Sequence, residues 1–271
     1  MPAPQPIPTF HRIGFRTEAI LDYLGGLAIL VGKALAALVL SPLKRGRSFQ
    51  RAVHQAMMVG VNAVPIITLI TFFVGVIIAL QGAYGLRRLG AMQLVAGLVA
   101  ISITRELGPL VAAIVVIGRS GSSFAAEIGA MRVTEELDAL KTMALDPVAF
   151  LVTPKLTAMM VMMPCLAMWS DLMGVTGGAL FGVTGADFTF GSYFMATREA
   201  LALRDITTGL VKSIVFGVVI TAVGCHEGFS TGAGAEEVGR STTSAVVISI
   251  LLVVMIDLAF TYLFYTARPG A

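Results

Sequence analysis

Charge is what this sequence has least of. Only 13% of its 271 residues are Asp, Glu, Lys or Arg, compared with about 25% in an average soluble domain. Hydrophobic residues make up 56%, and several apolar runs are roughly 20 residues long, enough to cross about 30 Å of hydrocarbon. The composition excludes an ordinary soluble protein and predicts an all-α polytopic membrane protein.

The sequence also has few cysteines and lacks a P-loop motif for nucleotide binding. The two cysteines, Cys165 and Cys225, fall in or at the end of apolar runs, so a disulfide framework is not expected. The glycine-rich run 118–123 lacks the lysine that a P-loop brings to phosphate. We therefore expect no catalytic residue, resident cofactor or metal in this chain, and the net charge of +3 does not suggest nucleic acid binding.

Five apolar segments are expected to span the membrane. They are Val61–Gln81, Ala91–Ile117, Leu156–Val183, Ile206–Cys225 and Thr243–Tyr265. A sixth, Ala19–Leu40, has basic residues on both flanks, and a spanning helix would place one basic cluster outside, against the positive-inside tendency. We therefore assign residues 1–50 to an N-terminal tail and an amphipathic helix in the cytoplasmic interface, and residues 51–271 to the transmembrane domain. Five spans place the N-terminus in the cytoplasm and the C-terminus outside.

Two further sequence patterns predict local structure: a ridge of glycines and a short amphipathic segment. Gly174, Gly178 and Gly182 form a ridge of small residues at four-residue spacing, which permits close helix contact within the chain or in a dimer. Residues 190–203 are expected to form a small amphipathic helix against the outer surface.

The most charge-dense segment lies between the second and third expected spans. Thr134 is expected to cap a short helix over residues 134–144, with Glu135 and Glu136 in its first turn, where the helix dipole favours acids. Asp146-Pro147 is expected to end the helix, because the residue before a proline avoids the helical region. This amphipathic helix is expected to lie in the cytoplasm and to present its acids to a soluble partner.

Charged residues inside the expected spans are the candidate functional residues, because charge is costly in hydrocarbon. The strongest case is Arg105 and Glu106, midway along the second span and shortly before Pro109. Pro109 cannot donate a backbone hydrogen bond to the carbonyl of Arg105, so the helix should bend or open there. Further candidates stand on the later spans: Asp171, Lys212 and Asp257. These charges either line a cavity for an amphipathic ligand or form structural ion pairs, and the sequence does not assign the pairs.

A series of short motifs runs from about residue 50 to the end of the chain. They are Ala79–Gly82, Thr104–Pro109, Gly118–Gly121, Ala126–Leu140, Asp146-Pro147, Gly174–Gly178, Lys212–Phe216, Gly239–Thr243 and Asp257. Because of the order and spacing of these motifs, the sequence closely resembles the MlaE/YrbE permease family. Its members are the membrane subunits of ABC transporters that move lipids together with MCE-domain proteins.

The resemblance implies a homodimer with two cytoplasmic ABC ATPase subunits, which bind ATP and magnesium. It further implies an MCE-domain protein on the outer face and, in some members, a STAS-domain subunit. The helix at 134–144 would be the coupling helix that docks on each ATPase. The residues assigned to coupling are Glu127, Arg132, Glu135, Glu136, Asp138 and Lys141. The lipid cavity would lie between two protomers, lined by Leu80 and Tyr84, by Arg105 and Glu106, and by the fifth span.

The expected function is therefore the permease subunit of an ATP-driven transporter in a bacterial inner membrane. It would move phospholipids between that membrane and an MCE-protein partner, a process that maintains outer-membrane lipid asymmetry. The alternative is a proton-coupled secondary transporter of an amphipathic solute, with Glu106, Asp171 and Asp257 as the proton relay. That alternative leaves the acidic cytoplasmic helix unexplained. A non-transporting scaffold subunit is a third reading, against which the buried charges argue.

Overall fold

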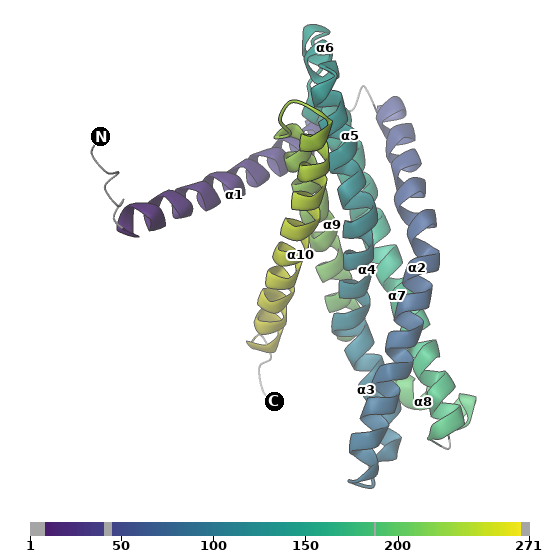
Figure 1. Ribbon diagram of the computed structural model, residues 1–271. Coiled ribbons are helices and arrows are strands. Elements are labelled where there is room, and N and C mark those ends of the chain that lie inside the picture. The colour runs from purple at the N-terminus through teal and green to yellow at the C-terminus, as the bar shows by residue number, and fades with distance from the viewer. Residues whose placement is uncertain (1–8, 41–44, 187, 267–271) are drawn as a thin grey trace.

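The computed structural model describes residues 9–40, 45–186 and 188–266, and all regular structure in these ranges is helical. The long helices are α1 (Thr9–Leu40), α2 (Arg45–Arg87), α7 (Thr153–Gly185), α9 (Leu203–Phe229) and α10 (Ala235–Thr266). The shorter ones are α3 (Val95–Ser102), α4 (Gly108–Val116), α5 (Ser122–Val133), α6 (Glu136–Thr142) and α8 (Phe190–Ala200). Figure 1 shows an elongated bundle with α6 at one end and α8 near the other. Residues 1–8 of the expected tail lie outside the described residues.

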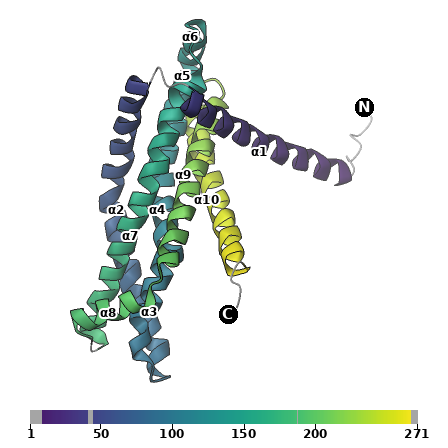
Figure 2. The same ribbon diagram turned by 180° about the vertical axis from the view of Figure 1, so that it is seen from behind.

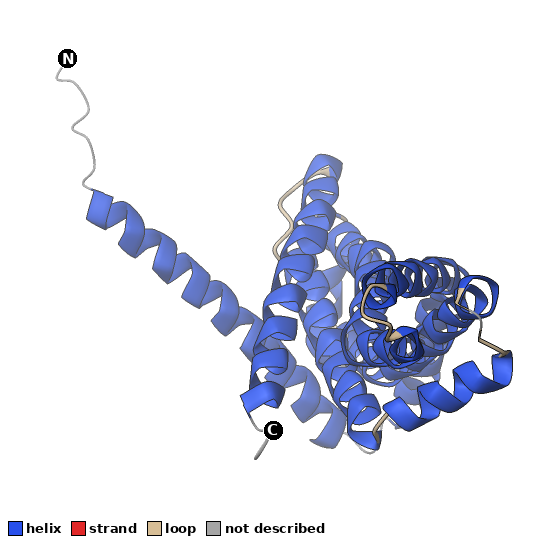
Figure 3. Ribbon diagram, turned by 90° about the horizontal axis from the view of Figure 1, so that it is seen from below, coloured by secondary structure: helices blue, strands red, loops and turns tan. Residues whose placement is uncertain are grey.

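Within the described residues, six helical segments are long and apolar enough to cross a membrane. Five of them overlap the five expected spans and extend beyond them, so the prediction of an all-α multi-span protein is confirmed. The sixth lies within α1, at Leu21–Leu38. Figures 1 and 2 show that α1 projects from the bundle at a wide angle, while α2, α7, α9 and α10 run along it. The view along the bundle in Figure 3 shows α1 leading away from the other helices.

The second span is part of one helical segment, Met92–Val133, that contains two π-helical turns. The first turn, Ile103–Leu107, ends where the backbone N–H of Gly108 bonds to the carbonyl of Ile103. The opening expected near Pro109 therefore takes the form of a π turn, which commonly marks a functional site.

This helical segment is longer than predicted, since it does not end at Ile117 but continues through α5. The reason is packing: Phe124 and Ile128 of α5 are buried, and they face Gly224 and Gly228 of α9, respectively.

The short charged helix begins later than predicted, because Thr134 does not cap it. The Thr134 hydroxyl donates to the carbonyl of Ala130 (3.0 Å) and thereby satisfies the end of α5. Glu135 then adopts a left-handed conformation (φ 61°), which separates α5 from α6. The assignment of Thr134 as an N-cap was wrong, but a short helix with Glu136 in its first turn is present.

The end of this helix also differs from the prediction. Helix α6 stops at Thr142, ahead of Ala144, whose φ of 56° is incompatible with a continuing helix. Asp146 accepts a hydrogen bond from the backbone N–H of Val148 (3.0 Å), and so supports the π turn Val148–Val152 that leads into α7. The Asp146-Pro147 pair therefore starts the next helical segment instead of ending α6.

Glycines bring α2 and α7 into backbone contact. A Cβ atom added to Gly75 would overlap the carbonyl oxygen of Gly174, and one added to Gly177 would overlap that of Phe72. The ridge at 174, 178 and 182 faces side chains of the same chain, including Val99 and Tyr193. Its close packing is therefore internal.

This packing yields a test with a matched control on the same helix. We expect Gly75→Ala to destabilise the protein by about 1–3 kcal/mol, because a backbone carbonyl cannot yield to the new methyl group. Gly85→Ala, ten residues further along α2, adds the same methyl group where nothing lies within 4 Å. The stability of this variant should be unchanged or higher, because alanine favours a helix more than glycine does. Thermal melting in detergent compares the two variants, and equal melting temperatures would contradict the close α2–α7 contact.

Candidate functional site

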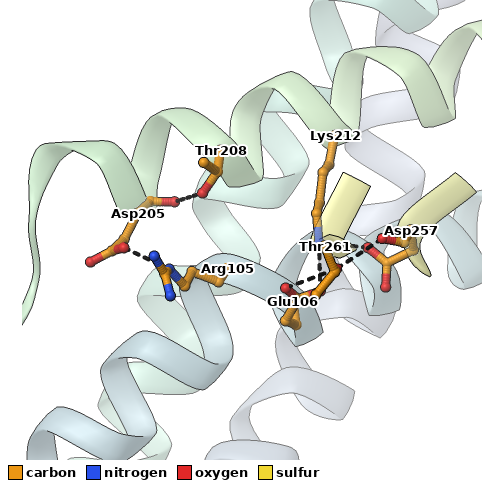
Figure 4. A network of polar contacts seen from close by, with 7 residues as sticks. All are labelled: Arg105, Glu106, Asp205, Thr208, Lys212, Asp257 and Thr261. Atoms are coloured by element: carbon orange, nitrogen blue, oxygen red, sulfur yellow. Dashed lines mark hydrogen bonds and ion pairs between the residues drawn. The ribbon is translucent and has the colours of Figure 1, made fainter. Parts of the chain in front are cut away.

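Lys212 of α9 is the centre of an ion cluster (Figure 4). Its Nζ atom lies 2.5 Å from Oε2 of Glu106 and 2.9 Å from Oδ1 of Asp257. It also donates a hydrogen bond to the Thr261 hydroxyl (2.8 Å), which lies 3.1 Å from Glu106. The Lys212 residue is 1% exposed, whereas the Glu106 side chain is 36% exposed, so the cluster joins α9, α10 and the first π turn around one buried cation.

A second ion pair lies two helical turns along α9. Arg105 Nε is 2.6 Å from Oδ1 of Asp205, whose other oxygen accepts the backbone N–H of Ala202 (3.0 Å) and caps the start of α9. Between these two ion sites, Gly209 of α9 approaches the backbone carbonyl of Thr104 so closely that a Cβ atom would overlap it. The absence of a side chain at Gly209 allows the neighbouring residues Arg105 and Glu106 to reach two partners on one face of α9.

These charges border a small cavity of about 90 Å³. It is lined by Arg105, Glu106, Arg204, Thr208, Lys212, Thr261, Phe264 and Tyr265. Two aromatic rings therefore stand beside ionic groups and a hydroxyl. Such a wall suits an amphipathic ligand, because charged groups hold a polar head while the rings contact an apolar part.

Of the predicted site residues, Glu106, Lys212 and Asp257 lie together, and Arg105 lies beside them with a different partner. Asp205 and Thr261 were missed from the sequence. Asp205 reads as one charge of the outer stretch, although its position three residues after Ala202 suits a helix start. Thr261 stands one helical turn after Asp257, and a hydroxyl at that spacing carries little signal by itself.

Asp171 does not belong to the cluster. It lies on α7 beside the π turn, where a Cβ atom added to Gly108 would overlap its Oδ1 atom. That oxygen is buried and has no hydrogen-bond partner in the described part of the chain. The neighbouring Ser170 donates to the carbonyl of Gly108 (3.0 Å), and Pro109 is buried in the first turn of α4. These residues therefore pack behind the cavity wall.

Leu80 and Tyr84 also lie apart from this cavity. Both are on α2 and are exposed, at 53% and 67%. The Tyr84 hydroxyl accepts a hydrogen bond from Arg88 (2.6 Å), whose guanidinium also covers the ring at 4.8 Å. In a single chain these side chains border no part of the ion cluster.

The residues assigned to coupling divide into two groups. Glu135, Glu136, Asp138 and Lys141 are exposed at the α6 end. The hydrogen bond from Lys141 (2.7 Å), together with its charge, holds the pKa of Asp138 below its usual value.

The other two contact more distant parts of the chain. Glu127 pairs with Lys155 (2.8 Å), and Arg132 donates to the carbonyl of Thr231 (2.8 Å).

The sequence model of the permease MlaE family matches residues 52–263. The chain belongs to this family. It is 41% identical over 255 residues to a probable ABC transporter permease protein of Rickettsia bellii. That alignment covers 94% of this chain and 97% of the relative. It is 32% identical over 251 residues to the intermembrane phospholipid transport system permease protein MlaE of Haemophilus influenzae. This second alignment covers 92% of this chain and 96% of the relative.

A chloroplast relative extends the comparison. The chain is 33% identical over 227 residues to protein TRIGALACTOSYLDIACYLGLYCEROL 1 of Arabidopsis thaliana, covering 84% of this chain and 65% of that protein. The resemblance inferred from the motifs is confirmed. The chain is an ABC transporter permease of the MlaE family, consistent with a role in lipid transport, and this membership argues against the proton-coupled alternative.

The ion cluster of this MlaE-family permease makes a specific prediction for stability. Lys212→Met should destabilise the protein by about 3 kcal/mol or more, because it leaves two partly buried carboxylates without their cation. Combining it with Asp257→Asn should restore part of the loss, since one uncompensated charge is then removed. Thermal melting of the single and double variants in detergent measures both effects. A Lys212→Met protein as stable as the wild type would show that the cluster carries no buried charge.

Proposed function

We propose that this chain is the permease subunit of an ATP-driven transporter that moves phospholipids between a bacterial inner membrane and an MCE-protein partner. The observation that carries the proposal is the ion cluster, in which Glu106, Lys212 and Asp257 border a cavity that also has aromatic walls. A phospholipid has the matching chemistry of a charged head and apolar chains. The name of the Haemophilus relative, an intermembrane phospholipid transport permease, supports the same substrate.

The cavity of one chain is too small for this task, which supports a homodimer. Its volume of about 90 Å³ is below the roughly 300–1,000 Å³ of sites that enclose drug-sized ligands. A second copy facing the cluster would enlarge the cavity. The side chains expected to complete it are on exposed faces of α2 and α10, with Leu80 and Tyr84 on one and Leu258 and Tyr262 on the other.

In the proposed mechanism, a separate ABC ATPase subunit binds ATP and magnesium and docks on α6. Helix α6 joins α5 through the break at Thr134 and Glu135, and α5 continues through both π turns to Arg105 and Glu106. Force applied at α6 would thus pass through this break into a helical path that leads to the cavity wall. ATP binding and hydrolysis would move this path and change the cavity between the two protomers.

The proposed orientation places the α6 end in the cytoplasm and the α8 end on the outer side. Helix α1 would lie in the cytoplasmic interface, leaving five spans, a cytoplasmic N-terminus and a periplasmic C-terminus. The MCE-domain protein would bind at the α8 end, where the capped helix α8 follows the third span. A STAS-domain subunit, present in some family members, would bind at the ATPase.

The role of α6 is tested by reversing its first charges. We expect Glu135→Lys/Glu136→Lys to abolish lipid transfer and its coupling to ATP hydrolysis, because both side chains are exposed at the proposed docking helix. Membrane insertion should be unchanged, since neither residue is buried. Lipid transfer between vesicles and the MCE partner, measured alongside ATP hydrolysis, reads out the effect.

The matched control is Glu236→Lys/Glu237→Lys, which reverses two adjacent acids at the start of α10. This variant should retain most of the activity. Equal loss in both variants would point to a general charge effect and contradict specific docking at α6. Purification from native membranes, with mass spectrometry of the subunits, gives the direct test of partners: a vanadate-sensitive ATPase should co-purify, and an inactive single chain would argue against the proposal.

A further inference from the structure

A stripe of exposed apolar side chains runs along α2, and none of its residues lines the cavity at the ion cluster. The residues recur at spacings of three or four, so they lie on one face of the helix. Each is between 44% and 67% exposed: Ile66, Leu69, Phe73, Ile77, Leu80 and Tyr84. Ile66 and Tyr84 are 18 positions apart, or about 27 Å of helix. The stripe is therefore about as long as the hydrocarbon core of a bilayer is thick.

The stripe ends in a cation. Arg88 follows Tyr84 by four positions and stands in the turn directly after α2. Its guanidinium carbon lies 4.8 Å from the centre of the Tyr84 ring, and its Nη2 atom donates a hydrogen bond to the Tyr84 hydroxyl (2.6 Å). Figures 1 and 2 show the turn between α2 and α3 at the end of the bundle opposite α6. In the proposed orientation, an apolar face of α2 thus leads outwards to an arginine.

The backbone holds Arg88 in a defined position. Three backbone hydrogen bonds of 3.0–3.3 Å, all within residues 86–91, close the turn. Gly90 has a φ of 65°, a left-handed conformation that favours glycine and commonly ends a helix. Because the turn is tight and Tyr84 is one helical turn away, the contact between ring and guanidinium sets the direction of the Arg88 side chain.

The Arg88 guanidinium retains hydrogen-bond donors for a ligand. It has five N–H groups, and the hydrogen bond to Tyr84 occupies one. Within the described ranges, the ion pairs include neither Arg87 nor Arg88. The sequence has no Asp or Glu between Asp22 and Glu106. A cation after a helix also interacts favourably with the helix dipole; that holds for both arginines and does not account for the contact of Arg88 with a ring.

These donors and the apolar stripe together identify the ligand. A planar guanidinium binds two phosphate oxygens at once through its N–H groups. A phospholipid joins a phosphate to two acyl chains, so its chains match the stripe and its phosphate matches Arg88. In the proposed dimer, Leu80 and Tyr84 complete the lipid cavity, and Arg88 stands on the same face one helical turn further out.

We propose that Arg88 binds the phosphate of the transported phospholipid at the outer mouth of the dimer cavity, where the lipid exchanges with the MCE partner. Tyr84 is a positioning residue for the guanidinium. The inference rests on the proposed function, and it adds the residue that recognises the lipid and the chemical group that is recognised. Because phospholipids share the phosphate, the site discriminates against neutral lipids such as diacylglycerol and not between headgroups.

The test uses the transport complex purified from native membranes and reconstituted in vesicles of phosphatidylethanolamine and phosphatidylglycerol. Lipid transfer between these vesicles and the MCE partner is the first readout. The second is photo-crosslinking with a phosphatidylglycerol that carries a diazirine near its glycerol, compared with a diacylglycerol that has the same chains and diazirine. Peptide mass spectrometry after chymotryptic digestion, which does not cut at arginine, should find the phosphatidylglycerol adducts within residues 80–91. The diacylglycerol probe should give few adducts there.

Three variants make the test specific. Arg88→Gln should raise the probe concentration for half-maximal labelling roughly three- to tenfold, because it removes a charge-assisted hydrogen bond, and should slow transfer by a similar factor. Arg88→Lys keeps the charge without the planar fork and should give an intermediate loss. Arg87→Gln removes the same charge from the adjacent exposed residue, whose side chain leaves the helix about 100° away, and should leave both readouts unchanged. A monodisperse elution profile confirms that each variant is folded.

The transfer readout separates this inference from the proposed function. If the wild type transfers no lipid, both are overturned. If the wild type transfers lipid and Arg88→Gln does so at the same rate, this inference alone fails. That holds even where labelling depends on Arg88, since the lipid bound there would then be a structural one outside the transport path.

The labelling readout has its own contrary results. Equal labelling by the diacylglycerol probe would contradict recognition of the phosphate. Slower transfer by Arg88→Gln with unchanged labelling would place the arginine in a protein contact with the MCE partner instead. Inorganic phosphate is added as a competitor: continued labelling supports the lipid, whereas complete displacement would identify a site for free phosphate.

Discussion

The charge of Lys212 is the constraint on which the arrangement around the cavity depends. An almost fully buried ammonium group is tolerated only when it is paired and hydrogen-bonded. Its carboxylate partners, Glu106 and Asp257, come from two other helical segments, so a single cation fixes the relative positions of three. This matters most for α10, whose buried side chains form one narrow stripe: Ser241, Ala245, Ser249 and Val253. The ion pair gives that weakly covered helix a directional attachment to the bundle.

The π turn allows two adjacent residues to serve different ion sites. Arg105 pairs with Asp205 and Glu106 with Lys212, although these partners are two turns apart on α9. The contact of Gly209 with the backbone at Thr104 brings the two segments close enough for both pairs. Local opening of one helix and the missing side chain of another thus act together at the two ion sites.

The sequence reasoning succeeded where one residue type determines the outcome and failed where packing decides. Pro109 predicted the opening of its helix, because a proline removes a backbone donor wherever it stands. Thr134 was assigned to the wrong helix, because a threonine hydroxyl satisfies either the start of one helix or the end of another, and only the left-handed turn at Glu135 decides. The choice of Asp257 over Asp171 as the partner of Lys212 depends on how three helices pack, which the sequence of any single span does not specify.

Hydrogen bonds near α6, at the end proposed to face the cytoplasm, also limit how the cavity can change. Arg132, at the end of α5, holds the carbonyl of Thr231 in the turn between α9 and α10, and the hydroxyl of Thr231 lies 3.0 Å from that of Ser241 on α10. The three segments that supply the ion cluster are therefore also joined to one another near α6. A displacement of α6 must carry them together or break these bonds as well as the cluster. Because separating buried ion pairs is costly, the cheaper motion keeps the cluster intact and moves it as a unit. In the proposed dimer, the space between protomers would then change while the ion pairs persist.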